Sequence, residues 1–134
     1  MFTSRIPLLA LSLACSAAHA GATAATGGEE TPLAQWRFET GTDGWEAHDA
    51  PIARSYAKAA DGGYSLEVKV DFPRPASLHR HVNFDVDRVG RIDYHVYVPP
   101  NAPQNVKTML FLKDKDGLWF QHFFEQSLQR GTWN

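Results

Sequence analysis

The chain has 134 residues, of which 43% are hydrophobic and 21% charged, so its composition is that of a single globular domain and not of a disordered protein. Its formal net charge of −2 leaves no basic excess to neutralise phosphates, so nucleic acid is not expected as a partner. The chain also lacks the length and the glycine-rich motifs of a dinucleotide-binding domain, so no nucleotide cofactor is expected.

Residues 1–20 have the pattern of a signal peptide. Arg5 is the early cation, an apolar run extends over Ile6–Cys15, and Ala18–Ala20 is a small-x-small cleavage site. We expect cleavage after Ala20, a secreted or periplasmic protein, and no membrane segment after cleavage. An alternative is a lipoprotein acylated at Cys15, although Ser12 stands where a large aliphatic residue is usual. Cleavage after Ala20 removes the only cysteine, so no disulfide is expected.

Residues 21–31 predict a flexible linker, because they are small, polar and non-periodic, and residues 32–134 predict one all-β domain. No eleven-residue window of this domain has a helical apolar stripe, whereas short alternating runs are separated by turn residues. Such runs at eight-to-twelve-residue spacing indicate an antiparallel β-sandwich. The predicted strands are Leu33–Glu39, Ile52–Tyr56, Tyr64–Phe72, Ser77–Phe84, Arg91–Val98, Lys107–Lys113 and Leu118–Glu125, the last two joined by an Asp114–Gly117 hairpin turn.

Catalytic motifs are not evident. The chain has no Gly-x-Ser-x-Gly motif, and its single cysteine lies in the signal peptide. Glycoside hydrolysis needs two carboxylates that face each other across a sugar, and nothing in the spacing of the acidic residues selects such a pair. These acids are expected to form turns and solvated strand faces, so a small hydrolase remains the last alternative.

Metal sites also have weak support from spacing. His79 and His81 share one face of a strand, and His95 on another strand would give three imidazoles suited to zinc. No fourth ligand has a diagnostic spacing, so polar groups on a sheet surface are the more economical interpretation. Asp114-Lys-Asp-Gly117 is not an EF-hand, because aligning its glycine places Leu112 and Phe123 where ligands belong.

The aromatic residues give the functional hypothesis. In Leu118–Glu125, alternation places Trp119, Gln121 and Phe123 on one side and Phe120, His122 and Phe124 on the other, and one set is expected to be core. Pyranose rings pack their C–H faces on aromatic rings, while sugar hydroxyls need polar partners. The candidate carbohydrate-binding residues are Asp93, His95, Tyr97, Trp119 and Gln121. The alternative is that an aromatic-rich sandwich simply has an aromatic core.

Five short segments, in this order along the chain, resemble carbohydrate-binding modules with the galactose-binding-like jelly-roll fold. They are Trp36–Trp45, Gly62–Leu66 (the family's Gly-x-x-Ser-Leu strand), Asp93–Pro99 (its D-V-Y-V-P strand), Lys113–Gln121 and Leu128–Trp133. The resemblance extends from Leu33 to Asn134. It implies a non-catalytic module that binds polysaccharide or oligosaccharide and lies N-terminal to a glycoside hydrolase or related catalytic domain.

The resemblance also implies a structural calcium ion and an incomplete domain. Glu39 matches the family's calcium-binding acid and Asp61 lies in the loop that often contributes, but the further aspartate of the closing strand has no counterpart before Asn134. We therefore expect the sandwich to be truncated before its closing strand or strands. The alternative function is a structural β-sandwich that packs against a catalytic domain without binding glycan.

Overall fold

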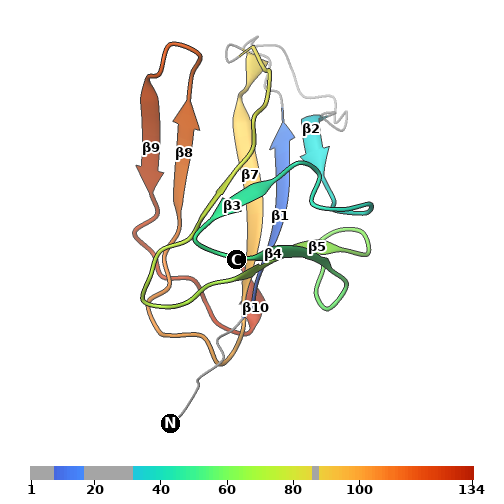
Figure 1. Cartoon of the computed structure of the whole chain (residues 1–134), viewed down its shortest axis with the longest axis vertical. Helices are drawn as coiled ribbons and strands as arrows, with labels where there is room; N and C mark the ends of the chain where they lie inside the picture. Colours follow the sequence, from blue (N-terminus) through green and yellow to red (C-terminus); the bar gives the residue numbers. More distant parts are fainter. Residues whose placement is uncertain (1–7, 17–31, 86–87) are drawn as a thin grey trace, which may run out of the picture.

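The computed structural model describes residues 8–16, 32–85 and 88–134, and this part of the chain contains β-strands and no α-helix (Figure 1). All the strand pairs are antiparallel, as expected for the predicted all-β fold. The strands are β1 (Leu8–Ser16), β2 (Pro32–Trp36), β3 (Glu46–His48), β4 (Ile52–Ser55), β5 (Ser65–Lys69), β6 (Ser77–His79), β7 (Arg91–Val98), β8 (Met109–Lys113), β9 (Trp119–Phe123) and β10 (Thr132–Trp133).

The main sheet has the strand order β10-β7-β1-β5-β4, and β1 and β7 run side by side at its centre (Figure 1). β1 is bordered on one side by β7. On its other side, residues 8–11 pair with β5 and residues 13–16 pair with β2. Three strands therefore meet along the two edges of β1.

Each of the seven predicted strands overlaps an observed one. Arg91–Val98 is confirmed with its predicted bounds, and Lys107–Lys113 and Leu118–Glu125 are confirmed as the shorter strands β8 and β9. Three strands were not predicted. β1 lies within the segment expected to be a signal peptide, and β3 and β10, with three and two residues, carry too little alternation to recognise.

The apolar alternation of β5 fixes its inward face. Leu66, Val68 and the following Val70 are buried, while Lys69 is exposed. Leu66 packs with Trp36 and Phe38 in one core cluster, and the Trp45 ring meets the Trp36 ring edge-on with centroids 5.5 Å apart. Dense packing of this kind makes the interior sensitive to loss of volume.

A second core cluster lies under β7. Val96 and Val98 of this strand pack with Ala102 and Val106 from the segment that follows it. Tyr94 is half-buried at the margin of the same cluster, so the even-numbered residues of β7 face inward. The predicted alternation of this strand is confirmed.

Two small sheets complete the described part of the chain. β3 pairs with β6, and β8 pairs with β9 as a hairpin that stands apart from the main sheet in Figure 1. In the hairpin turn, Asp114 Oδ1 accepts hydrogen bonds from the backbone N–H groups of Asp116, at 2.9 Å, and Leu118, at 2.8 Å. Gly117 has φ 86°, a left-handed conformation that glycine adopts without strain. The predicted hairpin turn is thus present.

The apolar part of the predicted signal peptide forms β1. The cleavage motif Ala18–Ala20 and the predicted linker, residues 21–31, lie outside the described residues, so export remains a prediction. Within the described part of the chain, no helix has the length and apolar character needed to cross a bilayer.

Candidate functional site

The outward face of β7 carries three of the predicted sugar-binding residues. Asp93, His95 and Tyr97 alternate with the inward residues, and His95 is exposed. Asp93 Oδ2 accepts a hydrogen bond from Arg91 Nε at 2.7 Å, in an exposed ion pair. This pair occupies part of the hydrogen-bonding capacity of Asp93.

Tyr97 belongs to an aromatic pair at the edge of the main sheet. It lies opposite Trp133 of β10, and the two ring centroids are 5.7 Å apart at an interplanar angle of 60°. The ammonium of Lys58 lies 5.1 Å from the centroid of the Tyr97 ring, within the range of a cation–π contact. Tyr97 is therefore held by its neighbours as a half-buried ring.

The other two predicted residues lie on one face of the β8–β9 hairpin. Trp119 is 62% exposed, and Gln121 lies two residues along the same strand, on the same face. The Phe111 ring meets the Trp119 ring edge-on with centroids 5.9 Å apart. Lys113, the cross-strand partner of Trp119, places its ammonium 5.3 Å from the centroid of that ring. We call the residues Phe111, Lys113, Trp119 and Gln121 the hairpin face.

The opposite side of the hairpin is also exposed. Phe120 is 58% exposed and its cross-strand partner Leu112 is 43% exposed, and His122 is exposed beside them. The expectation that one of the two sets in Leu118–Glu125 is core is therefore wrong. The physical reason is that β8 and β9 form a sheet of their own, so neither face of it lies beneath another strand layer in the described part of the chain.

The structure separates the five predicted residues into two groups. Phe124, just after β9, packs edge-on against Tyr94 with ring centroids 5.5 Å apart. The Tyr94 hydroxyl is hydrogen-bonded to the hydroxyl of Thr108 at 3.0 Å, just before β8. The hairpin is thus attached on the inward side of β7, whereas Asp93 and its outward neighbours lie on the other side. Trp119 and Gln121 are brought together, and they do not join the β7 group.

Sequence reasoning missed two members of the hairpin face, Phe111 and Lys113. The predicted four-residue turn would pair Lys113 with Leu118, whereas the structure pairs Lys113 with Trp119. A register shift of one residue moves the side chains of a strand to the other face, so the predicted turn did not identify the partners of Trp119. In the observed register Phe111 is diagonal to Trp119. The exposure of both residues could not be predicted without knowing that the hairpin stands apart.

The predicted calcium ligands are engaged with protein donors. Glu39 Oε1 accepts a hydrogen bond from the Gly63 backbone N–H at 3.0 Å. Asp61 Oδ2 accepts one from Gln35 Nε2 at 3.2 Å and lies 3.1 Å from Arg37 Nη2 in an exposed ion pair. Calcium needs six to eight oxygen ligands, and the described residues contain no group of three or more acidic, histidine or cysteine side chains. Calcium binding by Glu39 and Asp61 stays a prediction.

The three histidines considered as zinc ligands are not brought together. His79 and His81 have ring centroids 6.3 Å apart, and His79 Nε2 lies 3.5 Å from a carboxylate oxygen of Glu46. His95 lies on β7 in the main sheet, whereas His79 lies on β6 in a different sheet. The interpretation as polar surface groups fits this arrangement better than a zinc site.

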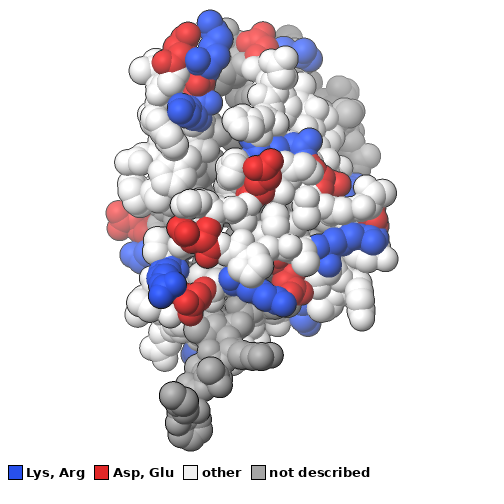
Figure 2. Space-filling model, in the orientation of Figure 1, with Lys and Arg blue, Asp and Glu red and all other residues white. Residues whose placement is uncertain are grey.

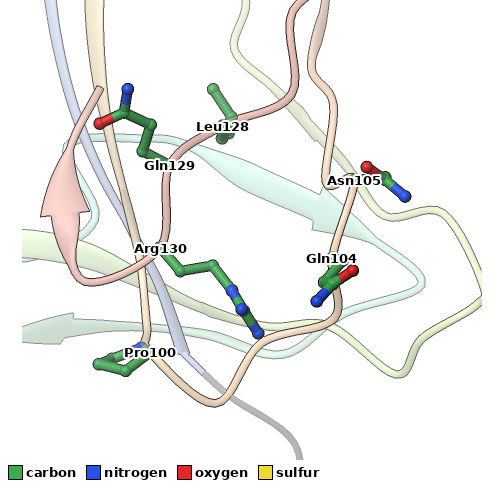
Figure 3. A pocket seen from close by; sticks show the side chains of 6 residues that line it. All are labelled: Pro100, Gln104, Asn105, Leu128, Gln129 and Arg130. Carbon is green, nitrogen blue, oxygen red and sulfur yellow. The ribbon is translucent and has the colours of Figure 1, made fainter.

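An open hollow of about 580 Å³ lies where the segment after β7 meets the segment before β10 (Figure 3). In Figure 3 the Arg130 side chain extends toward Gln104, and its Nη1 donates a hydrogen bond to the carbonyl of Ala102 at 3.1 Å. The amide and guanidinium groups that line the hollow suit sugar hydroxyls, but the apolar lining of the hollow is limited to Pro100 and Leu128. No aromatic ring lines it, so the hairpin face is the better candidate for stacking.

Neither the charge distribution nor comparison with known proteins singles out another site. Figure 2 shows acidic and basic side chains interspersed over one face of the molecule, without a large area of one sign. Searches against protein-family models, curated proteins and solved structures find no significant match to the chain.

Proposed function

We propose that this chain is a non-catalytic carbohydrate-binding domain of an exported glycan-active protein, with a β-sandwich of the galactose-binding-like jelly-roll type. The observation that carries the proposal is the hairpin face, where the exposed Trp119 ring lies beside Gln121. The partners are a polysaccharide or oligosaccharide and a downstream catalytic domain in a longer protein. The proposal narrows the binding residues to the hairpin face and leaves Asp93, His95 and Tyr97 as a separate group.

The hairpin face has the two chemical features that sugars require. The C–H face of a pyranose packs on an indole ring, and the Gln121 amide offers both a donor and an acceptor to the equatorial hydroxyls. Lys113 lies over one side of the Trp119 ring, so a sugar would stack on the other side. Phe111 supports the indole edge-on and limits its rotation, which lowers the entropy lost on binding.

A neutral glycan fits the charge distribution best. The charges on the face of the molecule shown in Figure 2 are mixed, and Lys113 is the only charged member of the hairpin face as defined above. A single exposed cation contributes little in water and is screened by salt. Binding dominated by stacking should therefore change little with ionic strength.

Affinity electrophoresis in gels cast with neutral polysaccharides tests the proposal. We expect at least one glycan to retard the wild type, and Trp119→Ala to lose about 1–3 kcal/mol of affinity, by analogy with other aromatic stacking contacts. Phe120→Ala is the matched control, because it removes a ring of similar exposure from the opposite side of the same strand. Equal losses in both variants, or no retardation on any glycan, would refute the proposal.

The second candidate function is a structural accessory domain that packs against a catalytic domain without binding glycan. It is favoured by the exposure of Leu112 and Phe120 on the side of the hairpin opposite Trp119. Large exposed apolar side chains on both sides of one hairpin are typical of protein contacts. In that case Phe120→Ala and Leu112→Ala would weaken association with the catalytic domain. Neither the wild type nor Trp119→Ala would then be retarded by any glycan.

A further inference from the structure

Strand β9 has a free edge. In the described part of the chain it pairs only with β8, and in Figure 1 β8 stands between β9 and β7. Trp119, Phe120 and Phe123 of this strand are 62%, 58% and 59% exposed. The strand contains no lysine, arginine, aspartate or glutamate, whereas β8 ends on Lys113. Proteins usually protect an edge with charged side chains, so the uncharged edge of β9 is available for pairing.

The hydrogen bonds that flank β9 show which of its backbone groups point to the free edge. The carbonyl of Leu118 accepts from the N–H of Asp114 at 3.1 Å, and the N–H of Phe124 donates to the carbonyl of Thr108 at 3.2 Å. Both bonds join even-numbered residues to the β8 side of the hairpin. Bonded and non-bonded pairs alternate along an antiparallel ladder, so residues 119, 121 and 123 direct their N–H and C=O groups away from β8.

These outward groups are complementary to a second copy of themselves. If two β9 strands meet antiparallel with residue 121 at the centre, residue 121 lies opposite its own copy and residue 119 lies opposite residue 123 of the other strand. All three outward-pointing residues of each strand then belong to bonded pairs, which use all three donors and all three acceptors. A register shifted by two residues leaves residue 119 or residue 123 without a partner in the other β9.

We propose that two copies of this chain form a dimer by antiparallel pairing of their β9 strands about a two-fold axis at Gln121. The two hairpins then form one four-stranded sheet in the order β8-β9-β9-β8. The contact uses the same edge of both copies, so it closes on itself as a dimer and does not propagate. The proposal is independent of glycan binding.

The side chains that meet across the axis are compatible. Directly opposite residues share one face of a sheet, so Trp119 lies beside the partner's Phe123, and each ring covers part of the exposed surface of the other. On the other face Phe120 lies opposite the partner's His122. The strand brings no like charges together at the axis, and a net charge of −2 per chain adds little repulsion between copies.

The size of the contact sets the strength that we expect. β9 contributes five residues from each copy, whereas a standard protein interface has about 20–30 residues on each side. The dimer therefore belongs to the weak class of interfaces and forms in a concentration-dependent equilibrium.

Sedimentation velocity of the full chain, from about 1 µM to about 1 mM, tests the proposal. Reductant is present throughout, so that Cys15 cannot link two copies by a disulfide. We expect a reversible equilibrium between monomer and dimer. A monomer at every concentration, or open-ended association without a dimer, would overturn the proposal.

Charges at the axis test the register. Gln121→Lys and Gln121→Glu should each weaken dimerisation by about tenfold or more, because like charges then lie directly opposite each other. An equimolar mixture of the two variants should form a heterodimer with a Kd within about tenfold of the wild-type value, because opposite charges then meet. Leu112→Lys is the matched control on β8, at an exposed residue away from the axis, and should change Kd by less than about threefold. A mixture that stays monomeric, or an equal loss in the control, contradicts pairing at Gln121.

Hydrogen exchange of the wild type, followed by NMR, gives a test that depends on no variant. Below Kd the N–H groups of Trp119, Gln121 and Phe123 point to water, whereas those of Phe120 and His122 are bonded to β8. Above Kd the first three should exchange about tenfold more slowly or less rapidly still, and the other two should change less. Unchanged exchange in the first three, or an equal change in both sets, would show that the free edge of β9 is not the contact.

Discussion

Tyr94→Phe tests how the hairpin is attached to the main sheet. The hydroxyl of Tyr94 is hydrogen-bonded to that of Thr108 at 3.0 Å, and its ring packs edge-on against Phe124. The substitution removes the hydroxyl and keeps the ring contact. A hydrogen bond of this kind contributes about 0.5–1.5 kcal/mol, and the lower half of that range is expected because Tyr94 is half-buried. In a domain of this size about 1 kcal/mol corresponds to a Tm lower by about 4–8 °C.

The pH dependence of stability gives a second readout of the same contact. Burial raises the pKa of Tyr94 above its ordinary value of 10.0, more than the hydrogen bond with Thr108 lowers it. The unfolded chain then loses the phenol proton first, so the stability is fully present below about pH 10 and is lost as pH rises through the folded-state pKa. Tyr94→Phe has no such proton and should lose less stability than the wild type above pH 10.

Urea unfolding at pH 7 and at a series of pH values above 10 measures both effects. The two proteins differ only at residue 94, so the difference between the two curves isolates Tyr94. Thr108→Val should give a similar loss at pH 7, and the double variant should lose less than the sum, because both changes remove one bond. Parallel alkaline curves, together with additive losses, would refute the proposed attachment.

Three further substitutions test the core, a strained turn and the calcium prediction. Leu66→Ala should cost about 2–5 kcal/mol of unfolding free energy in urea, because the side chain is fully buried, whereas Leu118→Ala, at a residue 61% exposed, should change it by less than about 0.5 kcal/mol. Gly62→Ala should cost about 1 kcal/mol or more, because Gly62 has φ 73° and an added Cβ would overlap Glu39 Oε1, whereas Gly41→Ala meets no atom within 4 Å and should have little effect by thermal melting. If Glu39 binds calcium, a hundredfold excess of calcium over Kd contributes about 2.7 kcal/mol to the free energy of unfolding, so chelator should lower the Tm of the wild type and not that of Glu39→Gln. A wild-type Tm that chelator leaves unchanged would refute the calcium prediction.

The strands that could be predicted are those whose alternation is long enough to detect. Arg91–Val98 has apolar residues at every second position, and it forms β7 with those bounds. Its inward and outward faces follow from the sequence because side chains alternate strictly in a strand. The Asp114–Gly117 turn was predictable for a similarly local reason, since Asp114 accepts hydrogen bonds within the turn itself.

Local backbone irregularities could not be predicted. Phe38 is fully buried and has φ 59°, a conformation that is uncommon for a large residue. Its N–H donates to Asp43 Oδ2 at 2.8 Å, and its carbonyl accepts from Arg54 Nε at 2.8 Å. The backbone of Phe38 is therefore held by side chains from two other segments, and the contact with Arg54 depends on the tertiary structure.

The sequence identified candidate binding residues but did not predict which of them lie together in space. Tyr97 and Trp119 were selected for their chemistry and strand alternation, which are local properties. Whether they share a face depends on which strands pair, and strand pairing is decided by contacts far apart in sequence. The attachment of Phe124 to Tyr94 places the hairpin on the inward side of β7, and that contact is what separates the two groups.

The most direct test of the proposed function is to observe the four tryptophan side chains while glycan is added. In an NMR titration with a soluble oligosaccharide of the glycan that retards the protein, each indole N–H gives its own signal, assigned by single substitutions. The account predicts that the Trp119 signal shifts in a saturable manner, while the signal of the buried Trp36 stays in place. A shift confined to Trp133, beside Tyr97, or no shift of any indole signal, would contradict binding at the hairpin face.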